Sequence, residues 1–253
     1  MTNIEYSFLI TTFAGLSTML GAILIFFKSK NTDRVVCSSL AFASGVMIMV
    51  SITDLIPSAI SGFLNMYYFI PAILFTLIFL VLGIVLSTLI NKYIPDISSK
   101  DISNKGLFKV GIISMIAIIL HNVPEGIATF MTSTKNISLG LSLALAITLH
   151  NIPEGISISI PIYYSTKSKL KSLLYTFVSG ISELIGAVIA YLFLAPYMNN
   201  FVMSILMALI AGIMISISKY ELIPASVKYK RVMDTIKFFF IGVIFMGMCH
   251  IFI

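Results

Sequence analysis

The chain has 253 residues, of which 58% are hydrophobic and 10% are charged, and its net charge at pH 7 is +6. A typical soluble domain carries about 25% charged residues, so this chain has too little charge to cover a soluble surface. This composition and a mean hydropathy of +1.05 exclude a soluble enzyme, a secreted disulfide scaffold and a nucleic-acid binder. Two cysteines, Cys37 and Cys249, are also too few for a disulfide framework or a thiolate metal site.

Eight apolar segments alternate with short polar or turn-forming connections, and each is long enough to cross a hydrocarbon core of about 30 Å. The first segment carries Glu5 instead of the basic start of a signal peptide, so it is interpreted as a retained helix. The predicted fold is an all-α integral membrane protein with a single transmembrane domain over residues 1–253. Its eight helices are expected at 5–27, 35–57, 66–90, 107–131, 137–162, 171–194, 200–223 and 232–253.

The basic residues predict which way the chain crosses the membrane. Fifteen of the sixteen lysines and arginines lie in or beside the connections that follow the first, third, fifth and seventh helices. With eight spans, all of these connections face one side, and Lys135 alone lies on the other. The positive-inside rule makes the lysine-rich side cytoplasmic and leaves both termini outside. Cys37 then lies at the cytoplasmic start of the second helix and Cys249 near the outer end of the eighth, so the two cannot pair within one chain.

Two pairs of helices share sequence patterns that indicate an internal repeat. GLSTMLGA at 15–22 aligns with GISELIGA at 180–187. The second and seventh helices share a longer pattern, which pairs Gly45 with Gly212, Met47 with Met214, Ser51 with Ser218, Asp54 with Glu221 and Pro57 with Pro224. The copies lie five helices apart and therefore cross in opposite directions, which is typical of secondary transporters. The alternative is chance similarity between helices rich in Gly, Ser and Met.

This repeat predicts a 3+2+3 arrangement of the eight helices. Helices 1–3 cover about residues 5–90, the two central helices cover about 107–162, and helices 6–8 cover about 171–253. We find no convincing match between the third and eighth helices. The central pair stands between the two copies, and it carries the most informative motifs of the chain.

The central helices each contain a hexapeptide, HNVPEG beginning at His121 and HNIPEG beginning at His150. A histidine and a glutamate four residues apart project from the same face of a helix. Two such helices packed face to face would bring together His121, Glu125, His150 and Glu154. Imidazole nitrogens with carboxylate oxygens suit a divalent transition metal such as Zn²⁺ or Fe²⁺. The alternative is that these side chains only hydrogen-bond across the helix pair.

The depth of these residues supports a cation. His121, His150 and Glu183 each lie about 18–20 Å from a membrane surface, at 1.5 Å per residue. A carboxylate at this depth costs several kcal/mol unless it is paired or hydrated. Apart from Glu5 and Asp234 in the first turns of their helices, five of the ten acidic residues fall inside predicted spans, and no lysine or arginine lies at central depth to neutralise them. A bound cation would neutralise them.

Other polar residues in the second and seventh helices are candidates for a path to this centre. Asp54 is expected near the outer end and Glu221 near the inner end, where Lys219 could neutralise it locally. The alternative is ordinary polarity at the helix ends. A lone histidine, His250, is interpreted as structural or incidental. The further path candidates are Ser51, Met214 and Ser218.

With these motifs the sequence resembles the ZIP (Zrt/Irt-like) family of divalent-metal transporters, particularly its bacterial zinc-uptake branch. The resemblance covers essentially the whole chain and depends on the doubled HNxPEG motif and on SGISELIGA from Ser179. It implies a multi-pass protein of the plasma (inner) membrane that imports Zn²⁺, with Fe²⁺, Mn²⁺, Co²⁺ and Cd²⁺ as further substrates. It also implies a homodimer, and neither an enzymatic activity, a cofactor nor a nucleic-acid partner is expected.

The resemblance further implies a two-metal centre. The main site would consist of His121, Glu125, His150 and Glu154, with Met47 near it, and a second site would add Asn122, Asn151 and Glu183, with Glu125 and Glu154 bridging. Two positions depart from the family pattern. Leu184 replaces a common proline after Glu183, and Ser58 replaces a frequent acid.

The leading hypothesis is therefore a secondary transporter that moves a transition-metal cation inward. An intramembrane metalloenzyme is the second hypothesis, but the chain lacks HExxH and clustered HxxxH motifs and has three histidines in total. A metal-selective channel is the third, and the sequence does not separate it from a carrier. Proton coupling and the type of motion also stay open.

Overall fold

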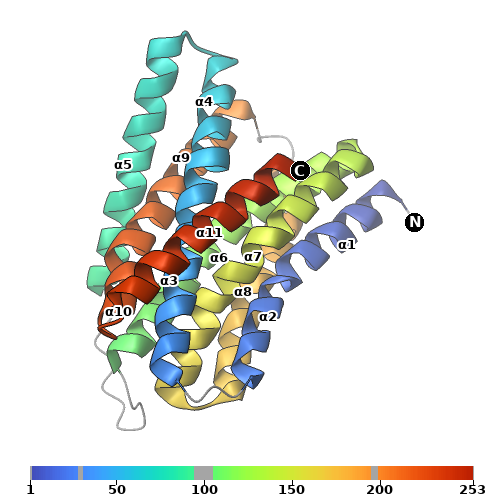
Figure 1. The fold of residues 1–253 in the computed structure, drawn as a ribbon. Helices are drawn as coiled ribbons and strands as arrows, with labels where there is room; N and C mark the ends of the chain where they lie inside the picture. The colour runs from blue at the N-terminus through green and yellow to red at the C-terminus, as the bar shows by residue number, and fades with distance from the viewer. Residues whose placement is uncertain (1, 28–30, 94–104, 195–198, 253) are drawn as a thin grey trace.

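The computed structural model describes residues 2–27, 31–93, 105–194 and 199–252, and all regular structure within these ranges is helical (Figure 1). In chain order the elements are α1 (Asn3–Leu16), α2 (Thr18–Gly21), η1 (Ala22–Phe26), α3 (Thr32–Val50), η2 (Ser51–Leu55), α4 (Ile56–Leu64), α5 (Phe69–Tyr93), α6 (Lys105–Lys135), α7 (Ile137–Thr166), α8 (Lys169–Ile189), η3 (Ala190–Leu194), α9 (Asn200–Ile217), η4 (Ser218–Leu222), α10 (Ile223–Val227) and α11 (Val232–Phe252).

Within the described ranges, eight helical stretches are long and apolar enough to cross a membrane, which confirms the predicted number. They are Asn3–Phe26, Thr32–Leu64, Phe69–Leu89, Lys105–Lys135, Ile137–Thr166, Lys169–Phe193, Asn200–Val227 and Val232–His250. Because successive spans run in opposite directions, the start of α1 and the end of α11 lie toward the same end of the molecule (Figure 1). The predicted connection at 91–106 falls mostly outside the described residues.

Polar side chains explain where several helices begin. Asn31, Asn136 and Asn199 each accept a hydrogen bond from the backbone N–H three residues later, and Ser168 does the same at the start of α8. These caps satisfy N–H groups that the helix leaves unpaired. Lys167 adopts a left-handed conformation with φ 57° and ends α7. The turn between α7 and α8 is therefore short.

The predicted ends of the second and seventh helices are wrong. The second span continues beyond Pro57 to Leu64, and the seventh continues beyond Pro224 to Val227. In both, a five-residue π-helical stretch, η2 or η4, comes directly before the helical turn that contains the proline. The proline then lies in the first turn of the following α-helical segment, a position that proline commonly occupies. Wider π-helical turns are frequent at functional sites.

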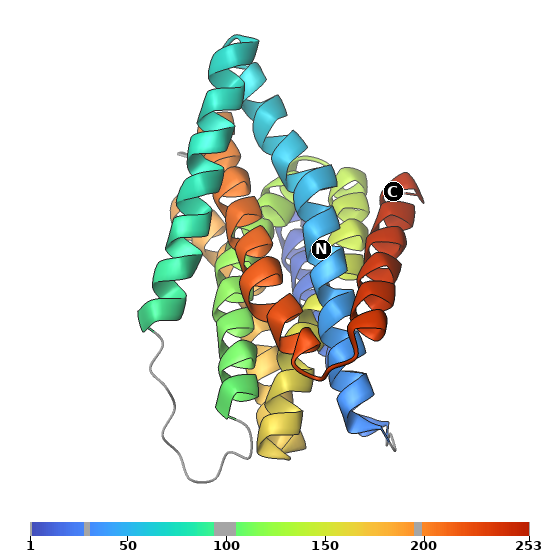
Figure 2. The ribbon, with the colours of Figure 1, turned by 60° about the vertical axis from the view of Figure 1, so that its left-hand side comes forward.

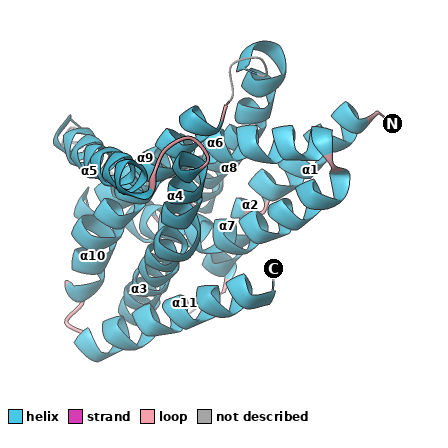
Figure 3. Cartoon of the chain, turned by 90° about the horizontal axis from the view of Figure 1, so that it is seen from above, coloured by secondary structure: helices cyan, strands magenta, loops and turns pink. Residues whose placement is uncertain are grey.

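The helices form two bundles that lie side by side (Figures 2 and 3). We call α1, α2, α6, α7 and α8 the site bundle, because α6 and α7 carry the hexapeptides and pack against α1 and α8. We call α3, α4, α5, α9, α10 and α11 the flanking bundle, in which α3 packs against α11 and α5 packs against α9. The two bundles meet mainly where α3 crosses α7.

Glycines hold the site bundle together at very short range. Gly15 of α1 and Gly180 of α8 face each other, so that a Cβ on either would collide with the other's carbonyl oxygen. In the same way Gly126 of α6 faces the backbone of Glu183, and Gly155 of α7 faces the backbone of Thr18. Small residues allow membrane helices to pack backbone to backbone. The glycine of each hexapeptide thus positions its helix against α8 or α2.

The contact between the bundles is different in character. It contains an apolar cluster in which Met47 and Val50 of α3 and Met214 of α9 pack with Ile156 and Ile160 of α7. Apolar contacts of this kind are not directional. The site bundle, in contrast, has hydrogen bonds between its own helices, such as those described below for the asparagines.

The glycine packing yields a stability prediction. Gly126→Ala should lower the free energy of unfolding by about 1–3 kcal/mol, because the added Cβ collides with the rigid backbone of Glu183. The measurement is the thermal unfolding of the purified protein in detergent. Gly247→Ala is the matched control, since its Cβ would meet the flexible end of the Met49 side chain. Equal stability of the two variants would contradict this view of the packing.

Candidate metal centre

The two hexapeptides meet inside the site bundle, as predicted from their spacing. His121 and Glu125 lie close to the middle of α6, and His150 and Glu154 lie close to the middle of α7. All four side chains are buried, with relative exposures of 5% or less. Both helices continue through their internal prolines without a break. The four side chains therefore share one enclosed space between α6 and α7.

Glu125 is the central member of this group. Its Oε1 lies 3.0 Å from Nε2 of His121 and 2.9 Å from Nε2 of His150, and the second contact is a hydrogen bond. Ligand atoms of these three residues lie within 4.8 Å of one another. Oε1 of Glu154 lies 3.5 Å from Nε2 of His121. His121, Glu125 and His150 thus present nitrogen and oxygen ligands close enough together for one divalent cation, and Glu154 lies beside them through its contact with His121.

Several oxygens in this space have no hydrogen-bond donor among the described residues. They are Oε2 of Glu125 and both carboxylate oxygens of Glu154. A buried polar atom without a partner is unfavourable by about 1–3 kcal/mol, and more when it is charged. Unpaired acceptors that converge on one space are what a cation needs as ligands. The geometry therefore fits a metal site better than a pair of hydrogen-bonded helices.

The asparagines of the hexapeptides are anchored in matching ways. Asn122 donates from Nδ2 to the backbone oxygen of Ser179 on α8 at 3.2 Å. Asn151 donates from Nδ2 to the backbone oxygen of Ala14 on α1 at 2.9 Å. Both anchors use the amide nitrogen, and both Oδ1 atoms have no donor within the described ranges. Each asparagine is thus held with a free acceptor oxygen.

Glu183 reaches the same region from α8. It is fully buried, and its Oε1 accepts a 2.5 Å hydrogen bond from Nδ2 of Asn151 while its Oε2 has no described donor. The helix runs unbroken from Lys169 to Ile189 through Leu184. Thr18, which aligns with Glu183 in the sequence repeat, is also buried, with an unpaired hydroxyl.

The methionine and serine candidates make their described contacts with residues outside the two hexapeptides. Met47 and Met214 are buried in the apolar cluster between the bundles. The hydroxyl of Ser51 donates to the backbone oxygen of Met47 at 2.8 Å. Ser218 is buried, and its backbone oxygen accepts a 3.4 Å hydrogen bond from Ser44. No described contact joins these residues to the histidines, and their assignment to the path stays a prediction.

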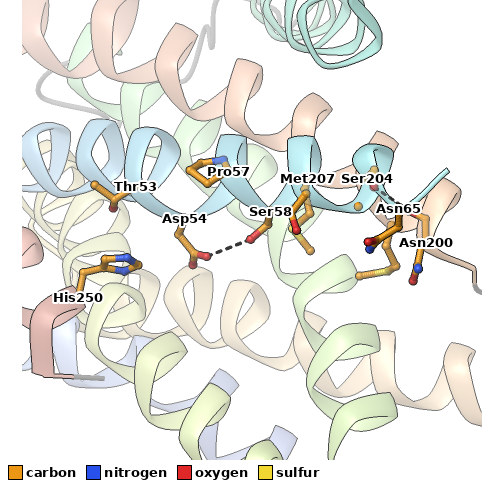
Figure 4. Close-up of a pocket in the computed structure, with 12 residues that line it drawn as sticks. Thr53, Asp54, Pro57, Ser58, Asn65, Asn200, Ser204, Met207 and His250 are labelled. Carbon is orange, nitrogen blue, oxygen red and sulfur yellow. Dashed lines mark hydrogen bonds between the residues drawn. The ribbon is translucent and has the colours of Figure 1, made fainter. Parts of the chain in front are cut away.

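Asp54 lines an open polar cavity of about 540 Å³ at the end of the molecule that contains the α4–α5 connection (Figure 4). Ser58, one turn later, donates a 3.3 Å hydrogen bond to Asp54 Oδ1. Asp54 is also close enough to His150 to interact with it electrostatically. His250, which the sequence analysis interprets as structural or incidental, lines the same cavity.

Glu221 is half-buried at the opposite end of the molecule. Nδ2 of Asn91 donates to its Oε1, and Lys109 and Lys228 interact with it electrostatically. Lys219, the expected neutralising partner, instead extends over the ring of Tyr220, with Nζ 5.1 Å from its centre. Lys219, two positions before Glu221 in the sequence, is therefore not among the partners described for this carboxylate.

Sequence reasoning missed the backbone anchors of the asparagines and the place of His250. The aligned repeats contain a signal for the anchors, because Ala14 and Ser179 stand at the same position directly before Gly15 and Gly180. Nothing in the sequence pattern indicates His250, because its neighbours come from helices far away in the chain. Only the packed structure brings it beside Asp54.

The geometry predicts a metal-binding hierarchy. Glu125→Gln should weaken Zn²⁺ binding by more than about 100-fold, because loss of an outer partner alone already costs 10–100-fold and Glu125 contacts both histidines. Equilibrium dialysis of the purified chain in detergent measures the affinity. Glu5→Gln, at the exposed start of α1, is the matched control. Unchanged affinity in folded Glu125→Gln protein would exclude this carboxylate as a ligand.

Comparison with known proteins agrees with the geometry of this centre. The family model described as "ZIP Zinc transporter" matches residues 98–250. Zinc transporter ZupT of Clostridium perfringens is 38% identical and the alignment covers 90% of this chain and 89% of the relative. The ZupT proteins of Campylobacter jejuni (39%; 92% and 91% covered) and Streptococcus mutans (40%; 89% and 89%) are similarly close. The chain thus belongs to the ZIP family of zinc transporters and is a multi-pass membrane protein.

Proposed function

We propose that this chain is a secondary transporter that imports Zn²⁺ into the cytoplasm through the centre between α6 and α7. One observation carries the proposal. The side chains of His121, Glu125, His150 and Glu154 converge in a buried space, and three of their carboxylate oxygens have no described hydrogen-bond donor. The family of this chain consists of zinc transporters, so we assign these ligands to transport and not to catalysis.

The ligand assignment follows from the unpaired oxygens. The first ion would bind His121, Glu125, His150 and Glu154. A second ion would share the two glutamates and add Asn122, Asn151 and Glu183. The anchoring of both asparagines through their amide nitrogens supports this assignment, because it leaves both Oδ1 atoms available as ligands. Met47 is proposed to lie near the first ion, and its packing in the same apolar cluster as Ile156, two residues after Glu154, is consistent with that position.

The topology of the proposal has both termini outside and a single transmembrane domain arranged as 3+2+3 helices. The excess of lysine in the connections at the α5–α6 and α7–α8 end supports the orientation. The facing of Gly15 and Gly180 supports the repeat, since aligned positions of the two copies meet at one point. In this orientation the cavity at Asp54 opens to the outside, and Glu221 lies on the cytoplasmic side.

Transport would proceed by alternating access, in which one bundle moves against the other. The apolar contact between α3 and α7 supports this, because nondirectional contacts can shift register without breaking hydrogen bonds. The hydrogen bonds and glycine contacts inside the site bundle would keep the metal ligands together during the movement. Binding needs neutral histidines and ionised glutamates, so metal affinity would fall in acid.

The mixed nitrogen and oxygen ligands also suit Fe²⁺, Mn²⁺, Co²⁺ and Cd²⁺, which we propose as further substrates. The location is the plasma (inner) membrane, where uptake from outside would occur. A homodimer is proposed by resemblance to the family. No cofactor enters the proposal, since the metal itself is the cargo.

Zinc uptake into proteoliposomes tests the transport function. Glu125→Ala and His150→Ala should each abolish uptake, because each removes a ligand from the buried centre. A zinc-sensitive dye inside the vesicles reports the rate, and Lys135→Ala, at the exposed end of α6, is the control. Counterflow of unlabelled zinc separates a carrier from a channel. Uptake at the control rate in both folded variants would overturn the proposal.

Labelling with a membrane-impermeant thiol reagent tests the orientation. In a variant whose Cys37 and Cys249 are replaced by serine, Lys135→Cys should react in intact cells. Lys167→Cys, at the opposite end of α7, should react only after the membrane is opened. The reverse pattern would show that the lysine-rich end faces outward.

A further inference from the structure

The open cavity at Asp54 lies apart from the buried centre and has a distinct composition. It is lined by residues of η2 and α4, by residues of α9, and by His250 near the end of α11. Figure 4 shows Asp54 and His250 toward one end of this cavity, and Asn65 and Asn200 toward the other. Among these side chains a carboxylate and an imidazole are the two strong metal ligands. No described lysine or arginine lines the cavity.

The pairing of Asp54 with His250 is made by the tertiary structure alone. Asp54 belongs to the π-helical stretch η2, and His250 lies 196 positions later near the end of α11. Both side chains are accessible, with His250 exposed and Asp54 half-buried. Ser58 donates a hydrogen bond to Oδ1 of Asp54 and so limits how the carboxylate turns within the cavity.

We propose that Asp54 and His250 form an outer binding site that captures a divalent transition-metal ion before it reaches the buried centre. The ion would keep water molecules as its remaining ligands, because the cavity is open and large enough to hold them. This site rests on the proposed function for its role in uptake, although metal binding at the site can be measured without transport.

The imidazole would make this site selective. Mg²⁺ and Ca²⁺ prefer oxygen ligands, whereas Zn²⁺ and similar ions bind a neutral imidazole well. A cavity with Asp54 alone would attract any divalent cation. With His250 beside it, the cavity would hold transition metals more tightly than the hard cations that are abundant outside cells.

The site is also suitably placed for transfer to the buried centre. Asp54 is close enough to His150 to interact with it electrostatically, and His150 is a proposed ligand of the buried ion. One carboxylate thus lines the open cavity and also interacts electrostatically with the central histidine. An ion released from His250 can remain in the field of Asp54 as it approaches α7.

Zinc binding by the full chain in detergent tests the outer site directly. The background variant is Glu125→Ala with His150→Ala, which removes ligands of the buried centre. Equilibrium dialysis should detect one weaker site in this background, and the addition of His250→Ala should abolish it. Met248→Ala, on the same helix with an exposed side chain, is the matched control and should leave it intact. No residual binding, or residual binding unaffected by His250→Ala, would overturn the outer site.

Transport kinetics distinguish this proposal from the proposed function. In the otherwise native chain, His250→Ala should raise the KM for zinc uptake several-fold and leave the maximal rate near that of Met248→Ala. His250→Asp should retain capture but make uptake sensitive to millimolar Mg²⁺, because the site would then consist of oxygens. An unchanged KM would overturn the outer site while leaving the buried centre intact. Uptake that survives loss of the buried centre would instead overturn the proposed function.

Discussion

The burial of carboxylates in an apolar bundle is the constraint on which the rest of this structure depends. Glu125, Glu154 and Glu183 are almost completely enclosed, and within the described residues the basic side chains that contact Glu125 and Glu154 are those of the two central histidines. Such groups are tolerated at membrane depth only when they are paired, hydrated or bound to a cation. Every nearby feature, from the anchored asparagines to the glycine contacts, helps to keep these oxygens in place.

The frame around the carboxylates is built twice from the same parts. Asn122 and Asn151 donate to backbone oxygens at aligned positions of α8 and α1. Ser17 and Ser182, also aligned, donate at 2.5 Å to those same two oxygens. Each carbonyl therefore accepts a hydrogen bond from a serine hydroxyl three residues later as well as one from a hexapeptide asparagine. Rigid supporting contacts of this kind hold metal ligands in position.

The sequence predicted the eight spans and the meeting of the two hexapeptides. Apolar length decides whether a helix can cross a membrane, and a spacing of four residues decides which side chains share a face. Both are local properties, so one sequence suffices to see them. The doubled motif also indicated that the two faces would meet.

Other features depend on contacts between distant parts of the chain and could not be predicted. The proline rule placed the end of the second helix at Pro57, but the π-helical stretch before it allows the helix to continue. Lys219 is close to Glu221 in the sequence, but the packed helices bring Asn91 and Lys109 to Glu221 instead. His250 acquired a candidate role solely because α11 ends beside η2.

The difference between Thr18 and Glu183 has a consequence for the whole centre. The backbone contacts at these aligned positions are closely matched, since each lies against the glycine of one hexapeptide. Their side chains are not matched, because one is a neutral hydroxyl and the other a carboxyl group. An ion bound between α6 and α7, as we propose, would therefore be surrounded by a backbone that is nearly two-fold and by side chains that are not. A carboxyl group would stand on the α8 side alone, so the set of ligands would have a direction that the backbone lacks.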